Sequence, residues 1–293
     1  MEITKAIIAD AGAIHKKTCI AFSGGADSTV LLDIIYRYSG IKPPVIFANS
    51  QMEYPETIDH IKAVCEKYGA DLHIAKADRT PAEQWIRAGY AMLGKLAGRL
   101  WTEKHRNNNL GFRVDCSNCC RTMKIIPARK LAVKIGCSLQ FTGLRGDADG
   151  SIRGLRAIKD GAIYYAKLDH LTICNALTGW TDTMIRRYIK THNLPNHPAR
   201  ARGAINIGCI ACGGGAQFDT SAFRLMRKLY PAQWREYIVG MQLGYVILAI
   251  KYNQHIDKVK EAIKQLGGLE KIANERPFIF DFISNTILQG MNK

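Results

Sequence analysis

The stretch that decides the fold is Thr18–Gly40, which reads TCIAFSGGADSTVLLDIIYRYSG. Its apolar start, TCIAF, is typical of a short buried strand, and TVLLDIIYRYSG places apolar residues at helical spacing until Gly40 ends the helix. A glycine-rich turn from a strand into a helix presents free backbone N–H groups at the positive end of the helix dipole. We therefore predict an anion-binding loop at residues 23–28.

The order of residues in this loop distinguishes it from other phosphate loops. Thr29 is not followed by Lys, so the loop is not the Walker phosphate loop, whose lysine reaches the terminal phosphates. The order Ser-Gly-Gly-x-Asp-Ser resembles the PP-loop of the ATP pyrophosphatase superfamily, whose members bind an adenine nucleotide and generally cleave ATP between the α- and β-phosphates. The resemblance implies that the nucleotide is held by Ser23, Gly24, Gly25, Ala26, Asp27 and Ser28.

Strands and helices alternate through the first half of the chain. The sequence predicts strands at 18–22, 44–48, 71–75 and 138–145 and helices at 28–39, 56–68 and from 80 onward. This alternation predicts an α/β fold with a parallel sheet flanked by helices, the fold expected of a PP-loop protein. A further short helix with a threonine cap is predicted within 178–195. Beyond Gly215 the pattern is helical, so we expect a nucleotide-binding domain at 1–215 and a helical domain at 216–293.

Composition indicates an ordinary globular protein, with 47% hydrophobic and 23% charged residues. The sequence has no uninterrupted apolar run long enough for a membrane helix, and its first thirty residues lack the layout of a signal peptide. We therefore expect a cytoplasmic protein without a membrane partner. Nine cysteines in such a chain are better interpreted as thiols or metal ligands than as disulfides. Four of them lie in apolar contexts typical of small core residues: Cys19, Cys65, Cys137 and Cys174.

Positive charge is concentrated in the middle of the chain. The net charge is 41 − 25 = +16, and the stretch Lys95–Arg202 contributes 20 − 7 = +13 of it. A nucleotide requires only a few cations, so this excess favours a polyanionic partner, DNA or another nucleic acid, over a merely solvated basic face.

Two cysteine clusters lie about ninety residues apart, Cys119-Cys120 and Cys209-x-x-Cys212. Four thiolates suit either zinc or an iron–sulfur cluster. Zinc would use the spacing of Cys116-x-x-Cys119, whereas adjacent cysteines chelate one small ion awkwardly and suit the separate iron corners of a cluster. The residues alone leave the cluster, zinc and the absence of a metal all open.

Taken together, the motifs resemble the phosphoadenosine-phosphosulfate reductase family, a branch of the PP-loop superfamily. After the loop at 23–28 come EYPET at 53–57, the paired cysteines, TGLRGDADGSIR at 142–153 and GCIAC at 208–212, in family order over roughly residues 15–215. The resemblance implies a [4Fe-4S] cluster, with zinc as the alternative, on the four thiols of Cys119, Cys120, Cys209 and Cys212.

Three departures from the family pattern bear on function. The family's Asp-Thr-Gly turn reads Asn49-Ser50-Gln51 here, and the glutamate of its arginine loop is replaced by Asp149, or by Asp147 in a shifted register. The family's reductases attack the sulfur of the substrate with a cysteine in a terminal Glu-Cys-Gly-Leu-His context, and no cysteine follows Cys212 in this sequence. A standard thiol-dependent reduction requires that nucleophile.

The remaining chemistry falls to charged side chains near the loop. Asp27 is expected to orient the turn or to hold Mg²⁺, with a helix cap as the structural alternative. Arg145 and Arg153 are expected to stabilise the charge that develops on a transferring phosphoryl or adenylyl group. Lys124 can reach the same anion. His197, within LPNHPAR, is expected to be an exposed loop residue.

The leading hypothesis from the sequence is an ATP-using enzyme that inserts sulfur into nucleic acid, by DNA phosphorothioation with a cysteine desulfurase as the sulfur donor. The second hypothesis is a sulfonucleotide reductase that uses a non-standard thiol, either external or Cys116. The third is a non-catalytic, cluster-bearing subunit that binds nucleic acid. The apolar run at 241–250 is expected to pack on the sheet domain or on a partner subunit, a second copy of the chain (a homodimer) being one candidate.

Overall fold

The computed structural model describes residues 1–15, 17–81, 83–84, 117–146, 158–159, 161–204, 207–210, 221–252 and 254–275. They pack into two compact units. The first unit comprises Met1–Asp78 and Cys120–Gly208, and the second comprises Arg79–Cys119 and Cys209–Lys293. The predicted domain boundary near residue 216 stays a prediction.

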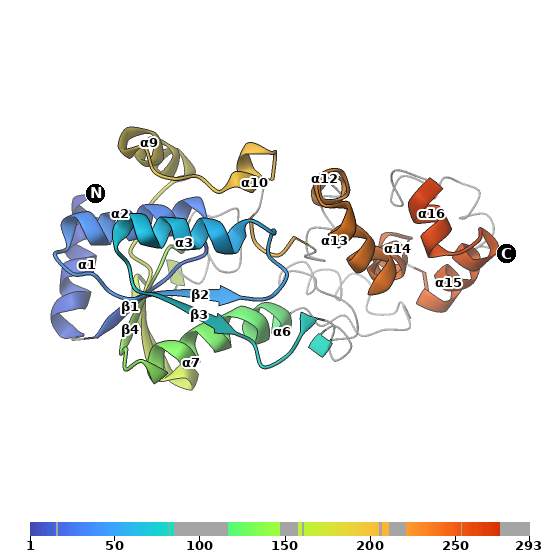
Figure 1. Cartoon of the computed structure of the whole chain (residues 1–293). Helices are drawn as coiled ribbons and strands as arrows, with labels where there is room; N and C mark the ends of the chain where they lie inside the picture. Colours follow the sequence, from blue (N-terminus) through green and yellow to red (C-terminus); the bar gives the residue numbers. More distant parts are fainter. Residues whose placement is uncertain are drawn as a thin grey trace. The chain divides into compact units, whose positions relative to one another are not determined.

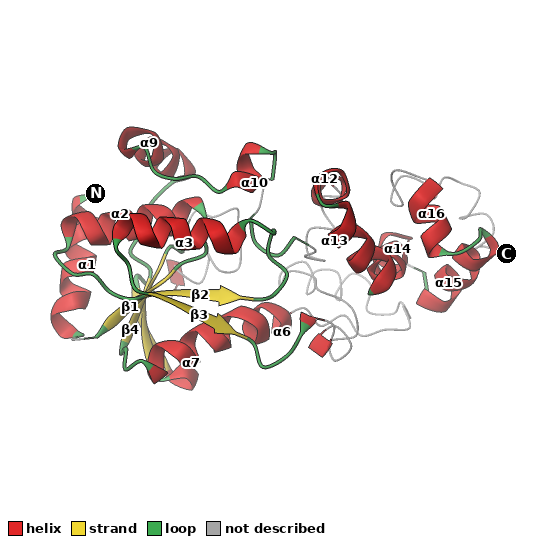
Figure 2. Ribbon diagram, viewed as in Figure 1, coloured by secondary structure: helices red, strands yellow, loops and turns green. Residues whose placement is uncertain are grey.

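A six-stranded sheet with the strand order β3-β2-β1-β4-β6-β5 is the framework of the first unit (Figures 1 and 2). All neighbouring strands pair in parallel except β5, which runs antiparallel to β6 at the edge. The predicted α/β fold with a parallel sheet is therefore confirmed. The strands are β1 (Thr18–Ala21), β2 (Val45–Asn49), β3 (Leu72–Lys76), β4 (Leu139–Thr142), β5 (Ile163–Ala166) and β6 (Leu171–Cys174).

Helices cover both faces of this sheet (Figure 1). Ile20, Val45 and Phe47 point into the core on one face, whereas their neighbours Cys19 and Ile46 point into the core on the other. Strands buried on both faces read as continuous apolar runs, which is why the sequence revealed them. The first face is covered by α1 (Glu2–Ile14), α2 (Ala26–Tyr38), α3 (Thr57–Tyr68) and α9 (Asp182–His192), and the second by α7 (Ile126–Lys134).

The helix that carries the paired cysteines is continuous but changes its winding. It comprises α6 (Ser117–Cys120), a π-helical turn η1 (Arg121–Ile125) and then α7. The Ile126 N–H donates to the Arg121 carbonyl, five residues earlier. Pro127 follows, and a proline inside a helix has no N–H to donate and its ring crowds the carbonyl four residues before it. The wider turn accommodates the proline at this point.

A buried carboxylate joins three of the four helices on the first face, α2, α3 and α9. Asp33 on α2 is fully buried and accepts two hydrogen bonds from Arg37, at 2.8 and 3.0 Å. The hydroxyls of Tyr68 on α3 and Tyr188 on α9 donate to it at 2.8 and 2.7 Å. Burial opposes ionisation of Asp33, but the hydrogen bonds from Arg37, Tyr188 and Tyr68 outweigh it and lower the pKa of the carboxyl group.

The described C-terminal part of the chain is helical, as predicted. Its apolar run forms α14 (Leu243–Tyr252), and Leu243, Val246 and Leu248 are buried. A Cβ on Gly244 would meet Leu269 and Ile238 side chains, so this run packs inside the second unit itself, a third option beside the two predicted. No helix among the described residues is long and apolar enough to cross a bilayer. The other described elements of this C-terminal part are α12 (Ser221–Leu229), α13 (Pro231–Arg235), η3 (Glu236–Gly240), α15 (Ile256–Gln265) and α16 (Leu269–Glu275).

Replacing Asp33 with Asn should destabilise the protein by about 3 kcal/mol at pH 7, because it removes the charge on which one arginine and two tyrosines converge. The folded-state pKa of Asp33 is depressed, so its contribution is present above the unfolded value and is lost as the pH falls through the folded value. Urea unfolding of the wild type and of Asp33→Asn should show a difference in the free energy of unfolding that is largest at pH 7 and decreases in acid. The exposed Asp10→Asn is the control, and equal losses for the two variants would contradict the assignment.

Candidate functional site

The predicted anion-binding loop lies at the carboxyl end of β1, between β1 and α2. In the strand order, β1 lies between β2 and β4. The chain continues from β1 to β2 on one side of β1, whereas β4 pairs with β1 on the other side. This is the topological switch point of an open α/β sheet, where loops diverge and ligands bind. The first turn of α2, with Gly25 as its N-cap, begins at this position. The fold therefore places a helix N-terminus where a phosphate would bind.

Side-chain hydroxyls hold the loop in shape. Ser28 Oγ donates to the Gly25 carbonyl at 3.0 Å, and the Ser23 N–H donates to Ser28 Oγ at 3.3 Å. Thr29 donates to the same Gly25 carbonyl from both its N–H and its Oγ1, at 2.9 Å each. The oxygens of Ser23 and Ser28 lie 3.1 Å apart. The predicted ligand-binding hydroxyls thus also stabilise the loop itself.

Close packing accounts for the two glycines of the loop. Gly24 has a φ of 72°, and a Cβ there would lie 3.2 Å from both His60 Cδ2 and Ile61 Cγ1. A Cβ on Gly25 would lie 3.4 Å from the Ile207 side chain. Gly24 is therefore required by its left-handed backbone as well as by its neighbours, whereas Gly25 is constrained by packing alone.

The loop after β4 packs directly on the start of α2. A Cβ on Gly143 would lie 2.9 Å from Ser28 N and 3.0 Å from the Asp27 carbonyl carbon, distances that only a glycine permits. Two residues later, Arg145 places its Nε 3.1 Å from Asp27 Oδ1. The structure thus brings together Asp27 and Arg145, which lie more than a hundred residues apart in the sequence and were both predicted to be functional.

Arg145 is a buried arginine between two carboxylates. Its side chain is 8% exposed, and its Nη2 lies 3.2 Å from Asp182 Oδ1 at the start of α9. Burial raises the pKa of Asp27, and the nearby Arg145 offsets only part of this effect. The arginine therefore positions the first turn of α2 as well as carrying positive charge to the site. Its predicted role toward a transferring group stays a prediction.

The loop after β2 is also closed by a carboxylate. Glu53 accepts hydrogen bonds from the Ser50 N–H at 3.2 Å and from the Met52 N–H at 3.1 Å, and it lies 3.3 Å from Lys124 Nζ. Gln51, which stands at the glycine of the family's Asp-Thr-Gly turn, has a φ of 64°. Gln51 therefore has a backbone conformation that favours glycine.

The cysteine clusters are described only in part. Cys119 is buried, Cys120 is exposed and Cys209 is half-buried, so the adjacent pair presents its thiols to different environments. Among the described residues, no group of three or more His, Cys, Asp or Glu side chains could hold a metal ion. Four soft thiolates suit an iron–sulfur cluster or zinc by their chemistry, and both stay predictions. Five other residues named from the sequence lie outside the described residues: Cys116, Asp147, Asp149, Arg153 and Cys212.

One residue expected at the surface is in fact buried. His197 is only 1% exposed, because its ring lies against α3 and caps α10 (Pro198–Ala201) by accepting the Ala199 N–H at Nδ1. Burial lowers the pKa of His197 to about 4. A polar residue directly before a proline at the first position of a helix is a capping signal, and it could have indicated this role. Sequence reasoning missed His60 altogether.

Comparison with known proteins identifies the family. The model for the phosphoadenosine phosphosulfate reductase domain matches residues 17–214, more than half of the chain and all of the loops described above. The chain belongs to this family.

Similar proteins share this domain at low identity. The adenosine 5'-phosphosulfate reductase of Geobacillus kaustophilus is 28% identical over 195 residues, covering 66% of this chain and 71% of the relative. The phosphoadenosine 5'-phosphosulfate reductase of Xylella fastidiosa is 27% identical over 192 residues, covering 65% and 70%. A solved phosphoadenylyl-sulfate reductase of Candida auris, in a phosphate complex, aligns with a TM-score of 0.48 at 19% identity, covering 70% of this chain and 87% of that one.

Replacing Gly143 with Ala should weaken nucleotide binding about tenfold or more, because its Cβ would displace the backbone at the start of α2. Calorimetric titration with adenosine 5'-phosphosulfate and with ATP measures the effect. Gly179→Ala is the matched control, since a Cβ there meets nothing within 4 Å. Equal affinities of the two variants would show that the loop after β4 does not shape the site.

Proposed function

We propose that this protein is a sulfonucleotide reductase. Its substrate would be an adenosine phosphosulfate, and its products would be sulfite and the corresponding adenosine phosphate. The observation that carries the proposal is the contact between the loop at 23–28 and the loop at 143–145, inside a domain that matches the reductase family from residue 17 to residue 214. The similar curated proteins that bear names of adenosine or phosphoadenosine phosphosulfate reductases support the same chemistry.

The proposed binding mode uses backbone amides and one arginine. The phosphate of the phosphosulfate would accept hydrogen bonds from the N–H groups of residues 24–28, at the positive end of the α2 dipole. Arg145, held by Asp27 and Asp182, would contribute its charge from the loop after β4. The two loops follow the carboxyl ends of the central strands β1 and β4, so the anion would bind to groups that are already oriented.

Reduction requires two thiols and releases sulfite. A thiolate attacks the sulfur atom, the bond between this sulfur and the phosphate oxygen breaks, and the adenosine phosphate leaves. The thiol sulfur is then attacked by a second thiolate, which forms a disulfide and expels sulfite. The two thiols supply the two electrons that the sulfur gains. Within this sequence the first thiol would be Cys116 or an external dithiol, because no cysteine follows Cys212.

A bound cofactor would be held by the remaining thiols. We propose that Cys119, Cys120, Cys209 and Cys212 bind a [4Fe-4S] cluster, which is what the family resemblance implies. Such a cluster would supply one-electron redox capacity and a concentrated charge.

Protein purified without oxygen should contain iron and acid-labile sulfide, and Cys209→Ser should lower both because it removes a ligand. Cys65→Ala is the control, since Cys65 is buried in the hydrophobic core of the first unit. Metal analysis and visible absorption measure the outcome. A colourless protein that contains zinc would contradict the cluster and would support zinc as the bound metal.

Sulfite release from adenosine 5'-phosphosulfate or its 3'-phosphorylated form, with dithiothreitol as reductant, tests the activity itself. Activity should fall to background in Cys116→Ser if the internal thiol attacks, and should persist if the dithiol attacks directly. Cys65→Ala should retain wild-type activity. Binding of both nucleotides without sulfite from either would contradict the proposed reduction.

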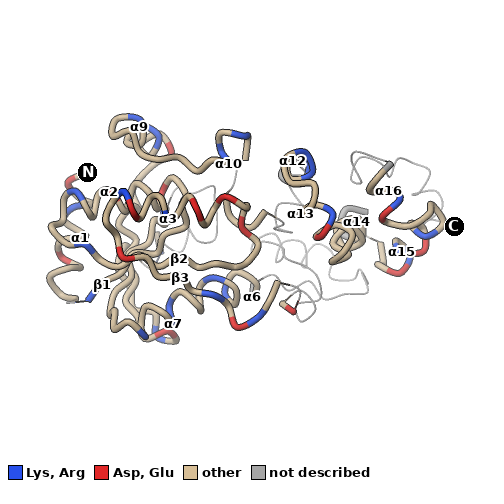
Figure 3. Tube along the Cα trace, viewed as in Figure 1, with Lys and Arg blue, Asp and Glu red and all other residues tan. Residues whose placement is uncertain are grey.

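A second candidate is ATP-dependent insertion of sulfur into nucleic acid, including DNA phosphorothioation with a cysteine desulfurase as donor. Its support is the excess of +13 between Lys95 and Arg202, part of which lies on exposed Arg186, Arg187 and Lys190 of α9 and Arg200 of α10 (Figure 3). This activity would produce AMP and pyrophosphate from ATP when DNA is present. Sulfite release without any ATP cleavage would decide for the reductase.

A further inference from the structure

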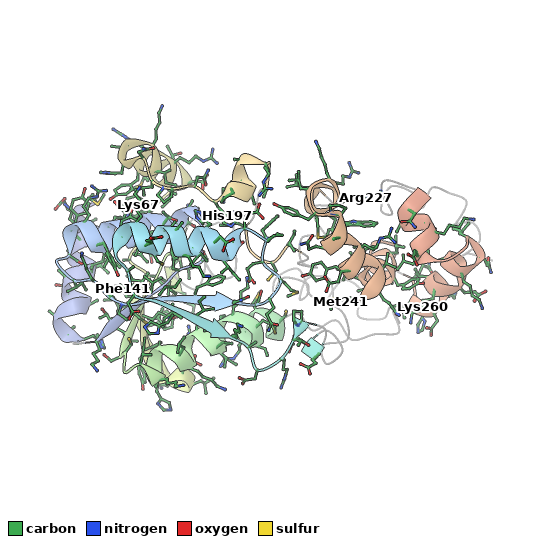
Figure 4. All side chains as sticks on the ribbon, viewed as in Figure 1. Lys67, Phe141, His197, Arg227, Met241 and Lys260 are labelled. Atoms are coloured by element: carbon green, nitrogen blue, oxygen red, sulfur yellow. The ribbon has the colours of Figure 1, made fainter. Side chains whose placement is uncertain are left out.

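Two histidines that the proposed reaction does not use lie behind the phosphate-binding loop. His60 is on α3, and His197, labelled in Figure 4, caps α10; their ring centroids are 4.9 Å apart at an interplanar angle of 63°. Because His197 Nδ1 accepts the Ala199 N–H at 3.1 Å, its proton lies on Nε2, which donates to Thr57 Oγ1 at 3.0 Å. Both nitrogens of His197 are therefore occupied.

His60 is occupied on one side only. Its ring hydrogen-bonds to the backbone of Gly24, and its Cδ2 lies 3.2 Å from where a Cβ on Gly24 would be. Its Nε2 is buried and has no hydrogen-bond partner among the described residues. A buried polar atom without a partner is costly and uncommon. Here it belongs to a titratable ring in direct contact with the predicted anion-binding loop.

The surroundings disfavour protonation of both rings while the loop is empty. Burial lowers the pKa of His60, and its hydrogen bond to Gly24 offsets this only in part. Burial, the neighbouring His60 and the charge of Arg200 lower the pKa of His197. The ring of Tyr54, from the loop after β2, lies 6.2 Å from His197. On α2, the Asp27 carboxylate is paired with Arg145 and is also influenced by Arg200.

We propose that His60 is a positioning residue that takes up a proton when an anionic nucleotide occupies the loop at 23–28. An anion on the Gly24 amide would place negative charge next to the imidazole ring, and an opposite charge in a partly buried site favours the protonated ring. The proton would go to Nε2, the free position. His197 would stay neutral, because a proton on Nδ1 would break its bond from the Ala199 N–H. This inference rests on the proposed function, since it requires the loop to bind adenosine phosphosulfate.

The consequence is that the nucleotide binds more tightly as the pH falls. Affinity for adenosine 5'-phosphosulfate should be severalfold higher at pH 5.5 than at pH 7.5, and a shift of one pKa unit on binding sets about tenfold as the upper limit of this ratio. Calorimetric titration without reductant measures this ratio, and the phosphosulfate itself has no group that titrates in this range. ATP serves only as a second probe of binding at constant pH, because its terminal phosphate itself titrates in this range.

Two variants separate positioning from a merely structural role. His60→Gln should bind the nucleotide equally well at pH 5.5 and pH 7.5, so that the affinity ratio becomes one. His73→Gln should keep the wild-type ratio, because His73 is paired with Asp71 near the start of the edge strand β3, two strands away from β1, whose carboxyl end carries the loop. A purely structural role of His60 would change the melting temperature and leave the ratio intact. If His60→Gln fails to fold, NMR titration of ring-labelled wild type decides, because the midpoint of His60 should rise on saturation with nucleotide.

The outcomes distinguish this inference from the function on which it rests. An unchanged ratio in His60→Gln, or an unmoved NMR midpoint, overturns the role of His60 while the nucleotide site stands. If neither adenosine 5'-phosphosulfate nor ATP binds to the wild type, the proposed function fails and the inference fails with it.

Discussion

The start of α2 is the constraint on which the rest of the site depends. A helix that begins at the end of a buried strand has N–H groups in its first turn that no helical carbonyl can accept. Ser28 and Thr29 direct their hydroxyls to the Gly25 carbonyl. Gly24 supplies the left-handed turn that lets the chain enter the helix at this angle. The anion site is thus a consequence of how a parallel strand connects to its helix.

The two ends of α2 are held by different ionic networks. At its first turn, Asp27 is paired with Arg145, which also contacts Asp182 of α9. Further along, Asp33 binds Arg37 and two tyrosines, one of them from α9. Buried carboxylates that are well paired resist displacement, because separating them would leave a charge without a partner. The helix that carries the phosphate-binding loop is therefore fixed against the same neighbour at two points.

The loops around the site differ in how far their sequences follow the family. The loop after β4 keeps its glycine and arginine, and the structure explains both, one by close approach and the other by pairing. The turn after β2 has Gln51 in place of the glycine, with a left-handed backbone, and Glu53 accepts hydrogen bonds from two backbone N–H groups of this turn. A left-handed backbone favours glycine, so Gln51 carries a conformational cost that a glycine would avoid.

Short-range patterns were sufficient for much of this protein. The order of strand, glycine turn and helix at 18–40 predicted the α/β fold, which is confirmed, and an anion site, which stays a prediction, because a turn of this kind depends on residues adjacent in the chain. Strands buried on both faces and a threonine cap on α9 were likewise readable. The edge strand β5 was not predicted, since half of its side chains are exposed and its pattern resembles a loop. Its neighbour β6 is largely buried but only four residues long, and the sequence analysis missed it as well. The burial of His197 was also missed, because it depends on contacts with α3 and Tyr54, which are far away in the sequence. Tertiary structure alone decided that Gly143 touches Ser28, that Arg145 lies between Asp27 and Asp182, and that an imidazole lies against Gly24. These contacts join residues far apart in sequence, and only the packing of parallel strands and their helices brings such residues together.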